Sequence, residues 1–283
     1  CHWYENPQNQ PGPWKQHVIW KSACNETPLY LDLFGTGKRG LLMATQPEGQ
    51  IAWFAPGKDP TQLWELHPIS DRSTKEKKVP GTDRFSHGLG AGDVNGDGRT
   101  DVLTTGGWWE QPVKNEGKPW TFHPARLGDA CADMYAYDLD GDGKADVLSS
   151  SAHNYGIWAH LQKPGKDGHP EFLKKDLFPK LVSQTHAMHF VDINGDGLRD
   201  LVTGKRWWAH GPKGDADPNL PATLFWFEQK KSKDGIVEFI PHKIDDDSGI
   251  GTQFWIGDFN GDKLLDIVIS NKKGVFLFEQ GRK

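Results

Sequence analysis

The sequence lacks the features of several protein classes. No run of apolar residues approaches the roughly 18 that a transmembrane helix needs, and Lys and Arg form no basic patch or stripe of the kind that binds nucleic acid. Only 3 cysteines occur among 283 residues, which is too few for a disulfide framework. We therefore expect no membrane span, no nucleic-acid partner and no disulfide scaffold.

Glycine, proline and tryptophan are plentiful instead, with 33, 19 and 13 residues. Gly- and Pro-rich turns between short apolar runs are typical of an all-β chain. The formal net charge is −5, and the acidic residues concentrate in short loops. Bound cations would neutralise much of this charge, so the charge does not indicate a basic partner.

Four of the acidic loops follow one pattern. Each has Asp or Asn at positions 1, 3, 5 and 9, which surrounds one point with hard oxygen atoms, and a glycine lets the backbone turn sharply beneath it. We predict that these loops bind up to four structural calcium ions. The predicted ligands are Asp93, Asn95, Asp97, Asp101, Asp138, Asp140, Asp142, Asp146, Asp192, Asn194, Asp196, Asp200, Asp258, Asn260, Asp262 and Asp266. A fifth loop, starting at Asp32, has lost the later carboxylates, and we expect it to bind no metal.

The loops belong to a longer repeat of four strands. The third strand is rich in aromatic residues, and the fourth carries a Trp or Phe that is followed three residues later by a His. The first positions of the five loops, residues 32, 93, 138, 192 and 258, are 61, 45, 54 and 66 residues apart. Four strands in such a period are typical of a β-propeller blade, whereas a β-sandwich does not repeat one motif five times. The pattern predicts a single all-β domain, residues 1–283, that forms a β-propeller.

The strand order predicts four whole blades, preceded by the last two strands of one blade and followed by the first three of another. A propeller closes its ring to avoid an exposed edge. We therefore expect the N-terminal part of the ring to lie in upstream sequence that is missing here. Seven blades in total are favoured, with six as the alternative.

These repeats resemble the FG-GAP/VCBS family, the integrin-α-like propellers with calcium loops. The resemblance covers nearly the whole chain and implies the fold and the calcium. It leaves the activity open, because this fold carries adhesion modules, lectin-like binders and enzymes alike.

The residue six positions before each loop lies at the start of strand one, beside the central channel and on the face opposite the loops. Glu26, His87 and His186 occupy this position in three blades, and Asp133 is next to it in a fourth. A purely structural role would give every blade the same residue, so this variation indicates a binding site; a solvated polar funnel is the alternative. His and carboxylate groups can hold a divalent transition metal or act as acid and base.

Residues that follow strand two should line the same opening, and a 17-residue insertion, 207–223, follows one of them as a lid or wall. An enzyme at this opening would use His87 or His186 as base or metal ligand. His153 or Tyr155 would be the acid. Lys205 and Arg206 would stabilise a developing enolate.

Other His and Trp residues recur along the chain, and recurrence indicates structural packing. The recurring histidines are His17, His67, His123 and His242. Trp108, Trp207 and Trp208 lie nearest the predicted rim and are candidates for stacking on a sugar. Cys24 and Cys131 also fall near the rim, where a disulfide, a metal ligand and a buried thiol are all open.

The first functional hypothesis is a carbohydrate lyase or dehydratase that eliminates next to a carbonyl or carboxylate. The segment from Thr185 to Asp192 is similar to a strand in the propeller domain of aldos-2-ulose dehydratase, which implies a keto-sugar substrate. The alternatives are a non-catalytic glycan- or protein-binding module and a structural domain of a surface protein. Because calcium loops suit a compartment rich in calcium, we expect the protein outside the cytoplasm.

Overall fold

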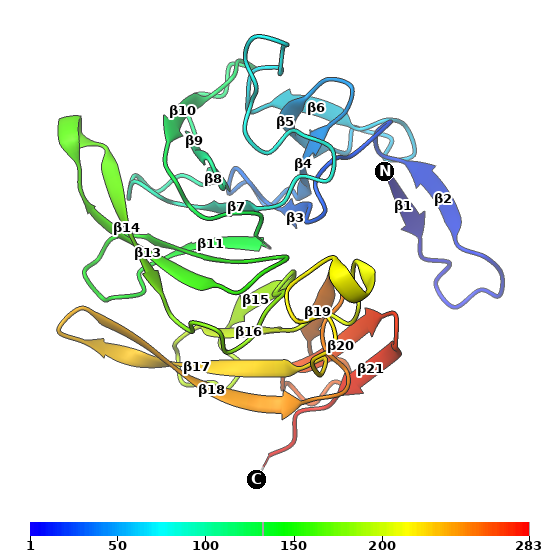
Figure 1. Ribbon diagram of the computed structural model, residues 1–283. Helices are drawn as coiled ribbons and strands as arrows, with labels where there is room; N and C mark the ends of the chain where they lie inside the picture. The colour runs from blue at the N-terminus through cyan, green and yellow to red at the C-terminus, as the bar shows by residue number, and fades with distance from the viewer. Residues whose placement is uncertain (132, 283) are drawn as a thin grey trace.

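Antiparallel β-sheets make up nearly all of the structure, a computed structural model that describes residues 1–131 and 133–282. Strands account for 42% of the chain and helices for 2%. The sheets stand around a common centre and curl into part of a ring (Figure 1). The prediction of an all-β fold that forms a partial β-propeller is confirmed.

The strands follow the predicted blade order. Within the described residues, two strands come first, β1 (His2–Glu5) and β2 (Lys15–Val18), and three come last, β19 (Phe254–Gly257), β20 (Asp266–Asn271) and β21 (Gly274–Phe278). Four complete blades lie between them: β3 (Leu29–Leu31), β4 (Gly40–Thr45), β5 (Gln50–Ala55) and β6 (Glu65–Pro68); β7 (Leu89–Gly92), β8 (Asp101–Thr104), β9 (Gly107–Glu110) and β10 (Thr121–Pro124); β11 (Asp133–Tyr137), β12 (Asp146–Ser150), β13 (Ile157–Pro164) and β14 (Pro170–Asp176); β15 (Met188–Val191), β16 (Asp200–Gly204), β17 (Leu224–Lys233) and β18 (Ile236–Asp245).

The innermost strands of neighbouring blades lie side by side. β7 pairs with β11 in parallel, with Leu89 opposite Asp133, and β11 contacts β15. Every acidic loop joins strand one of a blade to strand two, so all of these loops lie on one face of the ring. The starts of the inner strands meet on the other face.

The hydrophobic core is divided into clusters between adjacent blades. One cluster joins Leu148 and Ile157 of one blade to Leu201 and Phe227 of the next. β12 is buried at all five positions, because blades cover both faces of a second strand. This explains why second strands read as continuous apolar runs rather than as alternating ones.

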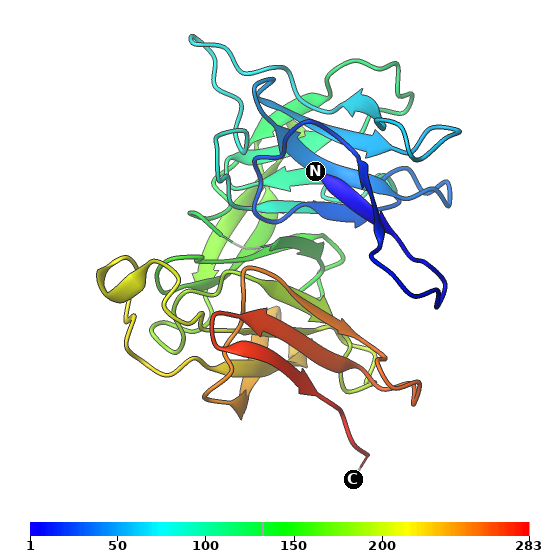
Figure 2. The ribbon, with the colours of Figure 1, turned by 90° about the vertical axis from the view of Figure 1, so that its right-hand side faces the viewer.

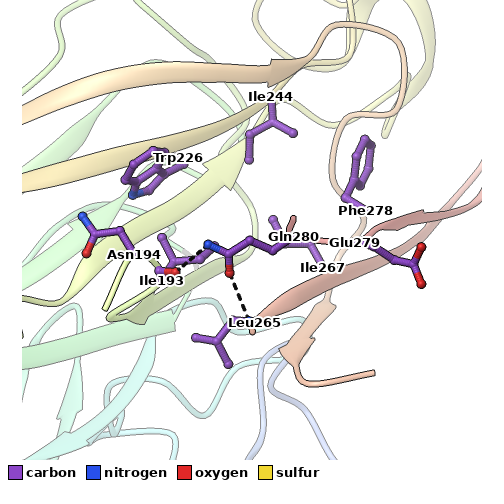
Figure 3. A pocket seen from close by; sticks show the side chains of 9 residues that line it. All are labelled: Ile193, Asn194, Trp226, Ile244, Leu265, Ile267, Phe278, Glu279 and Gln280. Atoms are coloured by element: carbon purple, nitrogen blue, oxygen red, sulfur yellow. Dashed lines mark hydrogen bonds between the residues drawn. The ribbon is translucent and has the colours of Figure 1, made fainter. Parts of the chain in front are cut away.

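A glutamine within strand three, or shortly after it, ties each acidic loop to the next blade. Its side-chain amide donates to the backbone carbonyl of the second residue of the preceding blade's loop over 2.8 to 3.5 Å; these residues are Gln111, Gln162, Gln229 and Gln280. Figure 3 shows Gln280 bonded to the Ile193 carbonyl and to the Leu265 amide, beside an apolar hollow of ≈ 240 Å³. The shape of each loop is therefore linked to the contact between two blades.

Three of the four recurring histidines of strand four stack on tryptophans of strand three. The pairs are Trp3–His17, Trp108–His123 and Trp226–His242, with ring centroids 4.2 to 4.5 Å apart. In each pair the histidine also contacts a glutamate that follows the tryptophan by two residues. Trp108 is only 1% exposed, so the prediction that it lies at the rim is wrong: it packs inside its blade.

His160 of β13 is expected to make stability depend on pH. Its ring is fully buried, Nε2 contacts the Ser149 hydroxyl at 2.9 Å, and Nδ1 has no partner among the described residues. Burial, with a smaller effect of Lys174, lowers its pKa to about 4. The unfolded chain, with a His pKa near the ordinary ~6.5, therefore binds the proton first as pH falls. Stability from this group is present above about pH 6.5 and is lost towards pH 4, by up to about 3 kcal/mol.

Urea unfolding of the wild type and of His160→Gln at pH 7 and pH 5 measures this effect. The free energy of unfolding should fall less for the variant than for the wild type, whereas His67→Gln, at a partly exposed position, should behave like the wild type. Equal losses in the wild type and His160→Gln would contradict the assignment.

Candidate functional site

Three side chains from different blades meet at the mouth of the channel, opposite the acidic loops. Nε2 of His186 lies 2.8 Å from Oε2 of Glu26, and Nε2 of His87 lies 3.4 Å from the same oxygen. The two Nε2 atoms are 3.1 Å apart. The structure thus brings together the residues found six positions before three of the loops.

The same backbone conformation presents both histidines. Phe85 and Gln184, each two residues before its histidine, adopt left-handed φ angles of 61° and 57°. Such angles are uncommon for residues other than glycine and concentrate at functional sites. The two blades have therefore kept a strained turn that aims a histidine into the channel.

Asp133 does not join this cluster. Its carboxylate, buried at 6% exposure, accepts a hydrogen bond from the Met188 amide over 3.3 Å, and burial raises its pKa to about 6. Counted back from the loops, Asp133 stands one residue later than His87 and His186, and in the sheet it lies opposite Leu89, two residues past His87. The residue in the matching position, Ala132, lies outside the described residues.

His153, in the loop after β12, extends the cluster outward. Its Nε2 lies 3.2 Å from Nε2 of His87, and its Nδ1 lies 2.9 Å from Asp215. Nη2 of Arg206 is 3.2 Å from the same Nδ1 and donates to the Ala152 carbonyl over 2.8 Å. One continuous chain of polar groups therefore runs from Glu26 to Asp215.

The insertion 207–223 forms one wall of the mouth. It contains η2 (Gly211–Lys213), and Figure 2 shows it projecting from one side of the ring, away from the turn between β1 and β2. The Ala216 amide donates to the His153 carbonyl over 3.1 Å, and Gln184 donates to the Ala216 carbonyl over 2.6 Å. Asp215, whose importance no repeat reveals, also accepts from His210 over 2.9 Å.

The charges at the mouth are largely shielded from water. Burial lowers the pKa of His87 and of His186; the Arg206 charge adds to this at His186, while Glu26 opposes it at both. Burial alone would raise the pKa of Asp215, but hydrogen bonds from His210 and His153 lower it. Burial thus favours the uncharged form of His87 and His186 and, through these hydrogen bonds, the arrangement favours the charged form of Asp215.

Two predicted catalytic groups make other contacts. The Tyr155 hydroxyl donates to Asp217. Lys205 is 3% exposed, and its Nζ donates to the backbone carbonyl of Arg206 over 3.2 Å. Both residues lie near the mouth, but the Tyr155 hydroxyl and the Lys205 ammonium group already make hydrogen bonds to other groups of the protein.

Two hollows open at the mouth and share Glu26 and His210. One, of ≈ 450 Å³, is lined by Trp207, Arg206 and Asn271 among others. The other, of ≈ 490 Å³, is lined by Phe85 and His87 among others.

Cys24 and Cys131 are free and buried, and burial raises the pKa of the Cys24 thiol to about 11.

The acidic loop at 138–146 brings three carboxylates together. Single carboxylate oxygens of Asp138, Asp140 and Asp146 lie within 4.8 Å of one another, close enough for one cation to contact all three. Backbone amides of Gly141 and Gly143 hold the Asp138 carboxylate over 2.7 and 3.0 Å. The other three loops have Asn at the third position and the same backbone hydrogen bonds to the first aspartate.

Comparison with known proteins supports the fold. Residues 138–203 match the family model of the FG-GAP-like repeat, which confirms the predicted repeat over that segment; the resemblance to aldos-2-ulose dehydratase stays a prediction. No curated protein matches. No helix in the described part of the chain has the length and apolar character to cross a membrane.

Three solved structures of low sequence identity are similar to this chain. A lectin from Agrocybe aegerita that recognises non-reducing terminal N-acetylglucosamine is 16% identical, with a TM-score of 0.52 over 88% of this chain and 61% of its own. The V. cholerae biofilm matrix protein Bap1 is 14% identical, with a TM-score of 0.41 over 95% of this chain and 37% of its own. The Photorhabdus luminescens Tc holotoxin pore is 14% identical, with a TM-score of 0.43 over 94% of this chain and 12% of its own.

Proposed function

We propose that this protein is a non-catalytic carbohydrate-binding β-propeller and that the channel mouth holds the glycan. The observation that carries the proposal is the ≈ 450 Å³ hollow, whose lining includes Trp207 together with Glu26, Arg206 and Asn271. An aromatic face for the C–H side of a sugar ring, with charged and amide groups for its hydroxyls, is the chemistry that a monosaccharide requires.

The exposure of the groups at the mouth suits binding. Trp208 is 40% exposed and its ring lies parallel to that of Trp207, with centroids 6.2 Å apart. The side chains of Glu26 and His153 are 28% and 33% exposed, so each offers polar atoms to a ligand. The lectin with a related fold adds support at the level of fold, since it recognises a terminal sugar.

A lyase or dehydratase acting on a sugar or keto-sugar is the second candidate. His87 and His153 lie in contact, as an acid and a base would, and Arg206 beside them could stabilise a negative charge. The engagement of Tyr155 and Lys205 within the protein disfavours it. Incubation with bound oligosaccharide separates the two: a binder leaves it intact, whereas a lyase releases an unsaturated or dehydrated product.

We further propose that calcium occupies the four acidic loops as a structural ion and that the protein works outside the cytoplasm. The carboxylate cluster at Asp138, Asp140 and Asp146 supports the first proposal. The second follows from the first, because weak to moderate calcium sites fill where calcium is plentiful.

Replacing Trp207 by Ala is expected to weaken glycan binding roughly tenfold, the value of one aromatic contact of about 1.4 kcal/mol. Oligosaccharides ending in N-acetylglucosamine, and an array of other glycans, are the probes, and calorimetric titration gives the affinity. Trp14→Ala is the matched control, because Trp14 is 54% exposed in the turn on the opposite face. Failure of the wild type to bind any glycan, or equal loss in both variants, would refute the proposal.

A further inference from the structure

His186 faces two hydrogen-bond acceptors with a single proton to share. Its Nδ1 lies 3.2 Å from the Thr252 carbonyl oxygen, and its Nε2 lies 2.8 Å from the Glu26 carboxylate. A neutral imidazole carries one N–H, and an ionised carboxylate and a carbonyl only accept. One of these two close contacts therefore lacks a hydrogen.

The same shortage extends to the neighbouring rings. Nε2 of His87 lies 3.1 Å from Nε2 of His186 and 3.2 Å from Nε2 of His153. A hydrogen on Nε2 of His87 can lie along only one of these two contacts. The nitrogens of His87 and His186 also lie beside the Glu26 carboxylate. A cation placed there satisfies atoms that the available hydrogens cannot.

We propose that Glu26, His87 and His186 bind one divalent transition-metal ion and that zinc is the ion that fits best. The three donor atoms form a triangle with sides of 2.8, 3.1 and 3.4 Å. A point about 2.0 Å from all three atoms, the usual zinc–nitrogen and zinc–oxygen distance, lies about 1 Å from their plane. The spacing of the three donor atoms therefore matches the dimensions of a zinc site.

The surroundings of the triangle match those of a metal centre. The Thr252 carbonyl holds Nδ1 of His186, the kind of outer contact that orients a metal-bound histidine. Two imidazoles and one carboxylate suit zinc and its transition-metal neighbours, whereas calcium takes six to eight oxygens. Three protein ligands leave a fourth position of a tetrahedral ion for water or a ligand, and two of the three, Glu26 and His87, line the ≈ 490 Å³ hollow.

Metal titration tests the site without any sugar, so its outcome is independent of the proposed glycan binding. The protein is stripped with a chelator and titrated with zinc by calorimetry and with cobalt(II) by visible absorption, with excess calcium present to fill the acidic loops. We expect one zinc ion per chain and a tetrahedral cobalt spectrum. His186→Ala should weaken zinc binding by about 100-fold or more, beyond the effect of losing an outer contact.

Glu26→Gln is the second variant, because Glu26 is partly exposed and the change preserves size; it should also weaken zinc binding while the circular dichroism stays unchanged. His242→Ala, a histidine in a blade stack, should bind zinc like the wild type. No zinc bound by the wild type would overturn the proposal. Unchanged affinity in Glu26→Gln would also overturn it, as would a loss confined to Asp215→Asn, which would place the ion at His153, His210 and Asp215.

Discussion

Chelation of calcium is expected to lower the melting temperature of this protein by roughly 10 °C or more. A site filled at 100 times its Kd stabilises the native state by about 2.7 kcal/mol, and each kcal/mol shifts the melting temperature of a chain this size by about 2 to 4 °C. Thermal unfolding in millimolar calcium and in EGTA measures the shift.

The fold explains why loop occupancy should affect the whole ring. In the 138–146 loop, Asp146 accepts the backbone amides of Leu139 and Gln162 over 3.0 and 2.8 Å. The Gln162 side chain in turn bonds the Val94 carbonyl of the preceding loop over 2.8 Å. Repulsion among carboxylates of an ion-free loop therefore acts on the contact between blades as well as on the loop.

A pair of variants separates calcium binding from loop folding. Asp138 and Asp32 both accept backbone amides of their own loops, but the loop of Asp32 lacks the later carboxylates. Asp138→Asn should reduce the calcium-dependent shift, whereas Asp32→Asn should leave it unchanged. If EGTA produces no shift in the wild type, or if both variants respond alike, the calcium assignment is incorrect.

The fold was predictable because the same sequence pattern recurs in every blade. Each blade supplies an acidic loop, an apolar second strand and an aromatic third strand, so errors in one copy are corrected by the others. The convergence of Glu26, His87 and His186 followed from the same register, counted back from the loops. Asp133 departs from the prediction because it lies within β11, opposite Leu89, whereas His87 and His186 come before the inner strands of their blades.

The outer part of the site was not predictable in this way. Asp215 lies in the insertion 207–223, which has no counterpart in other blades, and its contacts with His153 and His210 depend on how that segment folds over the mouth. The prediction for Trp108 was wrong although the repeat contained the answer, because its position in strand three identifies it as a stacking partner of His123. Periodicity locates side chains in the repeat but says nothing of segments that interrupt it.

Replacing Asp215 by Ala is expected to destabilise the protein by about 3 to 5 kcal/mol, the cost of leaving a buried charge without its partner. The Asp215 side chain is 2% exposed and that of Arg206 is 6% exposed, with 3.8 Å between their charged atoms. Asp215 also holds His153, so the variant should lose ligand binding at the mouth. Urea unfolding measures the loss of stability, and Asp246→Ala, which breaks an exposed pair with Lys243, should cost less than about 1 kcal/mol.

A double variant distinguishes the unpaired charge from a simple loss of packing. If the Arg206 charge causes the destabilisation, then adding Arg206→Met to Asp215→Ala should restore part of the lost stability, because no buried charge is left without a partner. Losses that simply add would show that the two residues act separately. A cost of Asp215→Ala no larger than that of Asp246→Ala would show that the insertion holds its place without this ion pair, and the mouth would then owe its shape to the backbone contacts of Ala216.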